Sequence, residues 1–215
     1  MRILLIILFL FWSYLSYSKD SDLFLIVDNI TLHFVKIDAG CLDTLAASKY
    51  NNIDKICFEK FYILDSEVTQ NLFEKIMGYN PSHLKRGGDY PLDSTTLNDV
   101  DDFIGKLSKK TGKRFRLPKE YEWEFVAMGK NRTRWSGTDS MDNLSYYAIF
   151  NSESSEVVKS RLPNDRGVYD MSGNVWEWVD NEISPNKYVI KGGGWNSKAK
   201  DLIIENRTYS DSGEG

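Results

Sequence analysis

Apolar, branched and aromatic residues are concentrated in two runs after residue 20, and such runs predict β-strands. Leu23 to Val27 and Thr31 to Ile37 are two such runs, and Asp28-Asn29 between them is a turn signal. These runs predict a strand pair. The apolar run from Phe58 to Leu64 predicts a further strand.

Three later segments place apolar residues at helical spacing. Thr69 is a candidate N-cap for a short helix over residues 69–78, and Thr96 for a longer one over residues 96–112. A third helix is expected over residues 118–129, because a proline begins the segment and a glycine ends it. The apolar positions are Leu72, Phe73, Ile76 and Met77, then Val100, Phe103, Ile104 and Leu107, and then Tyr121, Phe125 and Met128.

The second half of the chain has little periodicity. Residues 131–166 are polar with scattered aromatics, which predicts a long irregular region that needs a disulfide, a metal or tight packing to be ordered. Tyr188 to Lys191 is the last convincing strand and runs into three glycines. We therefore expect one loop-rich α+β domain over residues 19–215.

The segment GVYDMSGNVWEWVDN, residues 167–181, predicts a tight turn followed by a strand. Its first half is rich in turn formers, so the chain is expected to turn at Gly173 and then to extend. Side chains alternate across a strand, so Trp176 and Trp178 share one face while Glu177 lies on the other. Glu177 is then directed back beside Asp170.

Two interpretations of this corner remain open. The carboxylates of Asp170 and Glu177, the amide of Asn174 and nearby carbonyls are hard oxygen ligands of the kind that calcium prefers. Alternatively, Asp170 and Asn174 bond only their own backbone in a turn, and the tryptophans fill a core.

The first eighteen residues resemble an export signal. Arg2 precedes an unbroken apolar run from Ile3 to Trp12, and small residues follow before Lys19. We expect residues 1–18 to be a cleaved signal peptide of a secreted or periplasmic protein. An uncleaved membrane anchor is the competing interpretation, although the apolar run is short for a span, and no later segment could cross a bilayer.

The formal net charge is −4, which gives no sign of a polyanionic partner such as nucleic acid. One basic cluster is more typical of the solvated face of a helix and the loop after it. Its members are Lys106, Lys109, Lys110, Lys113, Arg114, Arg116 and Lys119.

The chain has two cysteines, Cys41 and Cys57. In an exported protein, an even number of cysteines favours a disulfide, which would stabilise the fold by about 3 kcal/mol in the chain-entropy model. Two buried free thiols are the alternative.

Several motifs together resemble one known family. The matching segments are FYILDSEVTQ (61–70), NPS (80–82), RLPKEYEWEF (116–125), GVYDMSGNVWEW (167–178) and GGGWN (192–196), followed by Arg207. They occur in the order of the sulfatase-modifying-factor family, whose best-known members are formylglycine-generating enzymes. The resemblance implies an α+β fold of few regular elements, distantly related to C-type lectins. It also implies that Cys41 and Cys57 form a structural bridge.

The resemblance sharpens the calcium hypothesis. Family members bind calcium at this corner through two side chains and two backbone carbonyls, and those positions correspond to Asp170, Gly173, Val175 and Glu177. Both side-chain positions are acidic here. The resemblance therefore favours a structural calcium ion over a plain turn.

The catalytic residues of the family do not carry over. Copper-dependent formylglycine-generating enzymes use a cysteine pair after the glycine turn, and the matching positions here are Ser197 and Leu202. Serine and leucine cannot replace thiolates as soft copper(I) ligands, so no copper is expected. Whether the protein is an enzyme stays open at this point, and the missing cysteines favour a protein without catalytic activity.

Two functions remain. The favoured one is an exported, non-catalytic binding or structural module of the cell envelope, whose partner is a peptide, a glycan or an envelope protein. Candidate ligand-binding residues are Trp195, Asn196 and Arg207, with the segment from Asn131 to Trp135 beside them; a core position for Trp195 is the alternative. The other function is an oxidase that converts a peptidyl cysteine to formylglycine in sulfatases.

Relatives usually continue past the position of Arg207 into a strand with a Gly-Phe-Arg signature, whereas this sequence stops at Gly215. We therefore expect the domain to lack the family's final strand.

Overall fold

A computed structural model describes residues 21–43 and 55–213. The expected signal peptide, residues 1–18, lies outside the described residues. Within the described part, no helix is both long enough and apolar enough to span a membrane.

The N-terminal sheet has the strand order β1-β2-β5, with β1 at Leu23–Val27, β2 at Ile30–Ile37 and β5 at Phe61–Leu64. The turn between β1 and β2 consists of Asp28 and Asn29, whose φ angles are 49° and 65°. Two positive φ angles suit the right-handed twist of a tight hairpin, and Asp and Asn tolerate them well. The predicted strand pair is therefore confirmed.

A second hairpin joins β3 (Gly40–Asp43) to β4 (Lys55–Phe58), and in it Cys41 lies directly opposite Cys57. The two cysteines form the expected disulfide. The single strand predicted from Phe58 to Leu64 is wrong, because the chain changes partners there. Phe58 pairs with Gly40 in this hairpin, whereas β5 pairs with β2.

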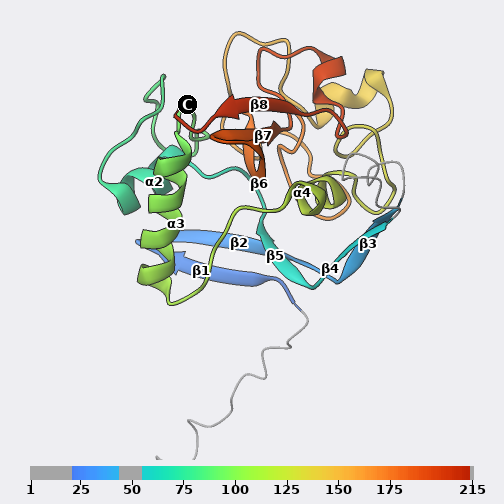
Figure 1. Ribbon diagram of the computed structural model, residues 1–215. Coiled ribbons are helices and arrows are strands. Elements are labelled where there is room, and N and C mark those ends of the chain that lie inside the picture. Colours follow the sequence, from blue (N-terminus) through green and yellow to red (C-terminus); the bar gives the residue numbers. More distant parts are fainter. Residues whose placement is uncertain (1–20, 44–54, 214–215) are drawn as a thin grey trace, which may run out of the picture.

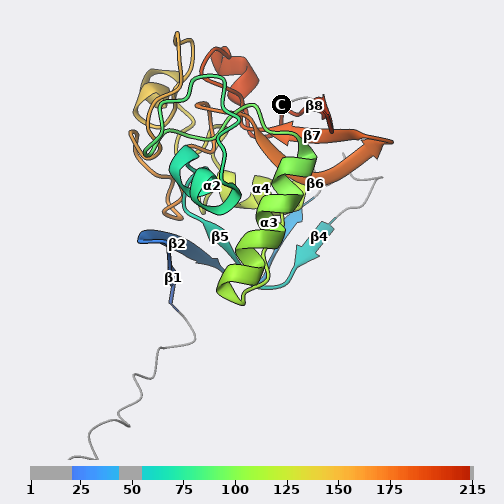
Figure 2. The ribbon, with the colours of Figure 1, turned by 90° about the vertical axis from the view of Figure 1, so that its left-hand side faces the viewer.

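Helices α2 (Gln70–Met77) and α3 (Leu97–Thr111) begin and end as their sequences predict. Thr69 accepts a hydrogen bond from the backbone of α2, and Thr96 forms a capping box with Asp99 at the start of α3. Both helices end at a glycine in the left-handed conformation. Figure 1 shows α2 and α3 together at the left of the molecule, and Figure 2, turned to face that side, shows them at the front.

Helix α4 (Glu120–Ala127) lies between the N-terminal sheet and the C-terminal strands (Figure 1). It buries three glutamates, Glu120, Glu122 and Glu124, which are 1%, 4% and 0% exposed. The sequence indicated only that acidic residues suit the N-terminal part of this helix. Their burial was not predicted, and each has a cationic partner from another part of the chain.

The C-terminal sheet has the order β6-β7-β8, with β6 at Glu177–Ser184, β7 at Lys187–Lys191 and β8 at Thr208–Asp211. Strand β8 was not predicted. Between α4 and β6 the chain is largely irregular, as expected, apart from the short 3-10 helix η1 (Met141–Tyr146); a second one, η2 (Ala199–Leu202), follows β7.

Strand β2 contributes to two hydrophobic cores because both of its faces are covered. Leu32 and Phe34 pack with α2 and α3, whereas Val35 and Ile37 pack with α4 and the C-terminal strands. The fold is therefore a mixed α and β arrangement of small sheets around shared cores, as predicted.

One buried cation links α4 to the end of the chain. Lys191 is fully buried, and its Nζ donates hydrogen bonds to Glu124 Oε1 at 2.6 Å and to the carbonyl oxygens of Ile204 and Asn206 at 2.7 and 2.6 Å. Removing one partner of such a pair leaves the other charge buried without compensation.

We expect Lys191→Met to lower the free energy of unfolding by about 3 to 5 kcal/mol, because Glu124 would stay buried without its cation. Lys187, an exposed residue on the same strand, gives the control. Lys187→Met should change the free energy of unfolding by less than about 0.5 kcal/mol. Adding Glu124→Leu to Lys191→Met should restore most of the loss. Urea unfolding of the four proteins measures these values, and equal losses in the two single variants would contradict the role of Lys191.

Candidate functional site: the acidic elbow and the indole hollow

Residues 170–177, here called the acidic elbow, turn sharply between α4 and β6. Asp170 and Asn174 both have φ angles of 59°, and Gly173 has a φ angle of 89°. A Cβ atom on Gly173 would lie 2.1 Å from the carbonyl oxygen of Ile149. The turn therefore requires glycine both for its backbone angle and for this close approach.

Backbone hydrogen bonds fix the elbow between two other loops. Gly173 N donates to Gly192 O at 2.9 Å, and Asn174 N donates to Ile149 O at 2.9 Å. Trp195 N donates to Asn174 O at 2.6 Å. The elbow thus holds the glycine-rich loop 192–195 directly beside it.

Glu67, just after β5, supports the elbow from a distant part of the sequence. Its Oε2 accepts a hydrogen bond from Asn174 Nδ2 at 2.8 Å, and its Oε1 accepts one from Val175 N at 3.1 Å. The sequence did not single out this residue. Only its place in the motif FYILDSEVTQ was a signal, because the contact joins residues more than a hundred positions apart.

The predicted pair Asp170 and Glu177 lies close enough for its charges to interact. Burial raises the pKa of Asp170 to about 6. Burial also raises the pKa of Glu177 to about 7, with a contribution from the negative charge of Asp170, although a hydrogen bond from Trp123 Nε1 acts in the opposite direction. Burial and both of these acids raise the pKa of Glu67 well above its usual range. Negative charge is therefore costly at the elbow.

The oxygens expected to hold calcium receive no hydrogen bond from the residues that the structure describes. In Asp170 only Oδ2 accepts a hydrogen bond, from Lys159 N at 2.7 Å. In Glu177 only Oε2 accepts one, from Trp123 Nε1. Their other carboxylate oxygens are free, as are the carbonyl oxygens of Gly173 and Val175. In the same part of the chain, no three His, Cys, Asp or Glu side chains form a metal site, so an ion here would depend on carbonyls as well.

The second feature is a cavity of about 340 Å³, here called the indole hollow, beside the elbow. Three tryptophans that are each half-buried, Trp176, Trp178 and Trp195, line it together with Asn196. The predicted ligand-binding residues Trp195 and Asn196 therefore meet in one cavity. Its other lining residues are Leu92, Asp93, Ser94, Thr95, Asn174, Val175, Ile190, Gly194 and Ser210.

Two other predicted recognition positions lie elsewhere. Arg207 is not among the lining residues, and its guanidinium binds Glu120 of α4 through both carboxylate oxygens, with Nε to Oε1 at 2.9 Å. Burial acts to raise the pKa of Glu120, but the bond from Arg207 and the charge of Lys191 hold it below its usual range. Trp135 is buried, and its Nε1 donates to Ala199 O at 2.8 Å.

The positions that correspond to the catalytic cysteines of formylglycine-generating enzymes have structural contacts here. Ser197 Oγ accepts a hydrogen bond from Gly194 N at 3.0 Å and so closes the glycine turn. Leu202 is fully buried in a small core with Trp135 and Leu144.

The family model described as "Sulfatase-modifying factor enzyme 1-like domain" matches residues 29–214. The chain belongs to this family. It is 27% identical over 230 residues to "Chaperone protein LppX" of Paenibacillus barcinonensis, a match that covers 79% of this chain and 81% of that protein.

A shorter match is to "Inactive C-alpha-formylglycine-generating enzyme 2" of Bos taurus, which is 27% identical over 128 residues, or 50% of this chain and 39% of that protein. Among solved structures, "Treponema denticola variable protein 1" superposes with a TM-score of 0.79 at 24% identity and covers 89% of this chain and 94% of that one. This likeness shows that the two proteins share a fold.

We expect Gly173→Ala to destabilise the protein more than a glycine substitution that costs backbone strain alone. Gly167 is the matched control, because its φ angle is 83° but no atom lies within 4 Å of an added Cβ. Gly167→Ala should lower the free energy of unfolding by about 1 to 2 kcal/mol. Gly173→Ala should exceed that loss, because the added methyl also meets Ile149 O. Thermal and urea unfolding compare the two, and similar losses would show that the elbow can relax.

Proposed function

We propose that this chain is an exported, non-catalytic binding module of its family, and that the indole hollow is its recognition site. The single observation that carries the proposal is the gathering of Trp176, Trp178 and Trp195 around one cavity with the amide of Asn196. Indoles offer large apolar faces at low entropic cost, and an amide supplies directional hydrogen bonds. Such a surface suits a peptide or a glycan of the cell envelope.

A polypeptide segment of an envelope protein is the partner that we put first. One relative that matches most of this chain is named a chaperone, and a chaperone acts on another protein. The bovine relative is named as an inactive formylglycine-generating enzyme. Both names support a role in which the fold is kept for binding.

The absence of copper-binding cysteines supports the same interpretation. Both cysteines of the chain are joined in the Cys41–Cys57 disulfide, so neither is a thiolate that can bind copper(I). Ser197 and Leu202 supply no sulfur in their place. Conversion of a peptidyl cysteine to formylglycine, the alternative function, would need a different metal site or a partner.

The same proposal includes a structural calcium ion at the acidic elbow. The ion would be held by Asp170, Glu177 and the carbonyl oxygens of Gly173 and Val175, which fit it because all are hard oxygen donors without a hydrogen bond at the relevant atom. A divalent cation would also offset the cost of burying negative charge, which is the main cause of the raised pKa values of the two acids. Calcium would thereby hold the loop that carries Trp195.

Binding can be tested with a peptide library tiled across envelope proteins and with a glycan array. We expect a peptide ligand whose affinity falls at least about tenfold in Trp195→Ala and in Asn196→Ala, because central aromatic and amide groups dominate such interfaces. Asn131→Ala is the control, since Asn131 is exposed and does not line the hollow.

If both variants keep their melting temperature and their affinity for every ligand found, the hollow is not the recognition site. Glycan binding with the same loss in the variants would support the site but change the class of partner. An aldehyde-trapping assay on a sulfatase-type peptide, with copper and oxygen supplied, tests the alternative. Aldehyde produced by this chain would overturn the non-catalytic assignment.

Calcium can be tested through linked changes in stability. Excess chelator at pH 8 should lower the melting temperature, and added calcium should restore it. Asp170→Asn should remove most of this response, whereas Asp142→Asn, an exposed acid on η1, should leave it intact. A chelator that leaves the melting curve unchanged removes the ion from the proposal.

The pH dependence has a definite sign. Raised carboxyl pKa values mean that the folded protein binds more protons than the unfolded chain, so the chelated protein should lose stability as the pH rises from about 4 to about 7. Calcium binding requires the ionised acids, so its stabilising effect should grow over the upper part of that range.

A further inference from the structure

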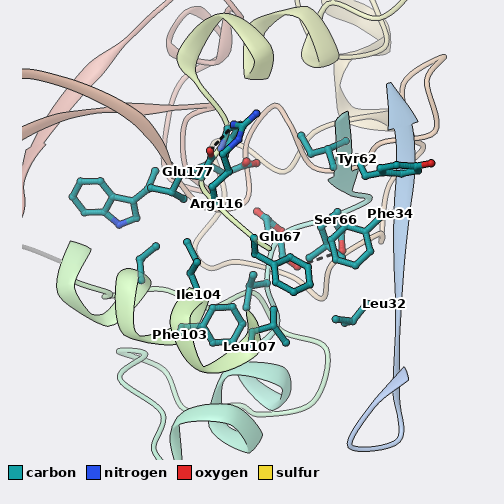
Figure 3. A pocket seen from close by; sticks show the side chains of 18 of the residues that line it. Leu32, Phe34, Tyr62, Ser66, Glu67, Phe103, Ile104, Leu107, Arg116 and Glu177 are labelled. Carbon is teal, nitrogen blue, oxygen red and sulfur yellow. Dashed lines mark hydrogen bonds between the residues drawn. The ribbon is translucent and has the colours of Figure 1, made fainter. Parts of the chain in front are cut away.

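A larger cavity of about 830 Å³ lies between the N-terminal sheet and α3. Figure 3 shows Phe103, Ile104 and Leu107 on α3 facing Leu32 and Phe34 on β2 across this space. The volume falls within the roughly 300–1,000 Å³ that small-ligand sites occupy. It adjoins the indole hollow, with which it shares Leu92, Thr95, Val175, Trp176 and Trp178, but most of its lining is separate.

The walls of the cavity are mainly apolar. Several of the apolar residues that line it pack against one hydrophobic core but remain only partly buried. They are Leu23, Leu25, Leu64, Val68, Leu92, Ile104 and Phe115. Apolar side chains that face a hollow lose the contacts that close packing would give them. An apolar occupant would supply those contacts.

One part of the lining is exposed and basic. Lys60, Lys113 and Arg114 line the cavity and are exposed to solvent, so they mark where it opens. None of the three forms an ion pair within residues 21–43 and 55–213. Arg116 also lines the cavity, but Glu122 holds its guanidinium with two bonds of 2.6 and 2.7 Å.

The two acids in the lining, Glu67 and Glu177, contact or belong to the acidic elbow. Both oxygens of Glu67 accept hydrogen bonds from the elbow, and Glu177 accepts one from Trp123 Nε1. The charges left for a ligand at the opening are therefore cationic. An anionic group at the end of an apolar chain complements this arrangement.

We propose that the cavity binds a single-chain fatty acid, with its alkyl chain between β2 and α3 and its carboxylate at Lys113 and Arg114. The inference does not rest on the proposed function, because none of the residues substituted in its test, Leu25, Ile104, Lys113 and Arg114, lines the indole hollow. Trp176 and Trp178 line both cavities, so they are left unchanged in the test.

The test measures hexadecanoate binding to the purified protein by calorimetry. Ile104→Trp places a large side chain into the cavity from α3, and Leu25→Trp does so from β1 on the opposite wall. Two variants are made so that the test still works if one of them does not fold. We expect saturable binding to the unaltered protein and loss of binding in each filled variant that keeps its circular dichroism spectrum. Binding of hexadecanoate should also raise the melting temperature of the unaltered protein.

Charge at the opening is tested separately. Lys113→Glu with Arg114→Glu should weaken hexadecanoate binding about tenfold, because two attractive charges become repulsive. The matched control is Lys106→Glu with Lys109→Glu, because both residues are exposed on α3 and do not line the cavity. This control should change the affinity for hexadecanoate little. Hexadecanol, which has no charge, should bind the reversed variant and the unaltered protein equally.

Three outcomes would overturn the inference. They are no binding of hexadecanoate, equal binding by the filled variants, or a structure in which a segment of this chain or a peptide fills the cavity. Loss of peptide binding at the indole hollow with hexadecanoate binding intact would instead count only against the proposed function.

Discussion

The fold depends on the short helix α4 and on the buried acids that it carries. Glu120 binds Arg207 and Glu124 binds Lys191, so the helix is tied to the C-terminal part of the chain, while Glu122 binds Arg116 in the segment that leads into the helix. Trp123, on the same helix, donates its indole hydrogen bond to Glu177 of the elbow. Since a buried charge is costly without its partner, the contacts of Glu120 and Glu124 specify where distant segments must lie.

This constraint explains how a chain with few regular elements positions the indole hollow. The elbow is fixed by α4 and Glu67, and the loop of Trp195 is fixed by the elbow. Ser197 and Leu202 then stabilise the same loop, through a hydrogen bond to Gly194 and packing against Gly193. Sites of different chemistry can be placed on one fold when its framework is independent of the reacting atoms.

The elements that the sequence predicted well are those whose signals are local. The caps at Thr69 and Thr96 and the turn at Asp28-Asn29 depend on neighbouring residues, and all three are as expected. The elbow and the meeting of Trp195 with Asn196 also follow from short spacing. Burial of the glutamates of α4, the support from Glu67 and the change of partner after Phe58 depend on contacts between distant segments, which periodicity does not report. The contact of Arg207 with Glu120 could not be predicted either, because the two residues are 87 positions apart. The sequence therefore indicated Arg207 only as a candidate ligand-binding residue.

The Cys41–Cys57 disulfide has a consequence for how this fold can diversify. It joins facing residues of the β3–β4 hairpin and so encloses the intervening residues in a covalent ring. The entropic cost of closing a loop rises only slowly with its length. Insertions between the two cysteines would therefore lengthen the ring. The disulfide and the register of β3 and β4 would stay fixed. Evolution can vary the sequence there with little penalty to the core.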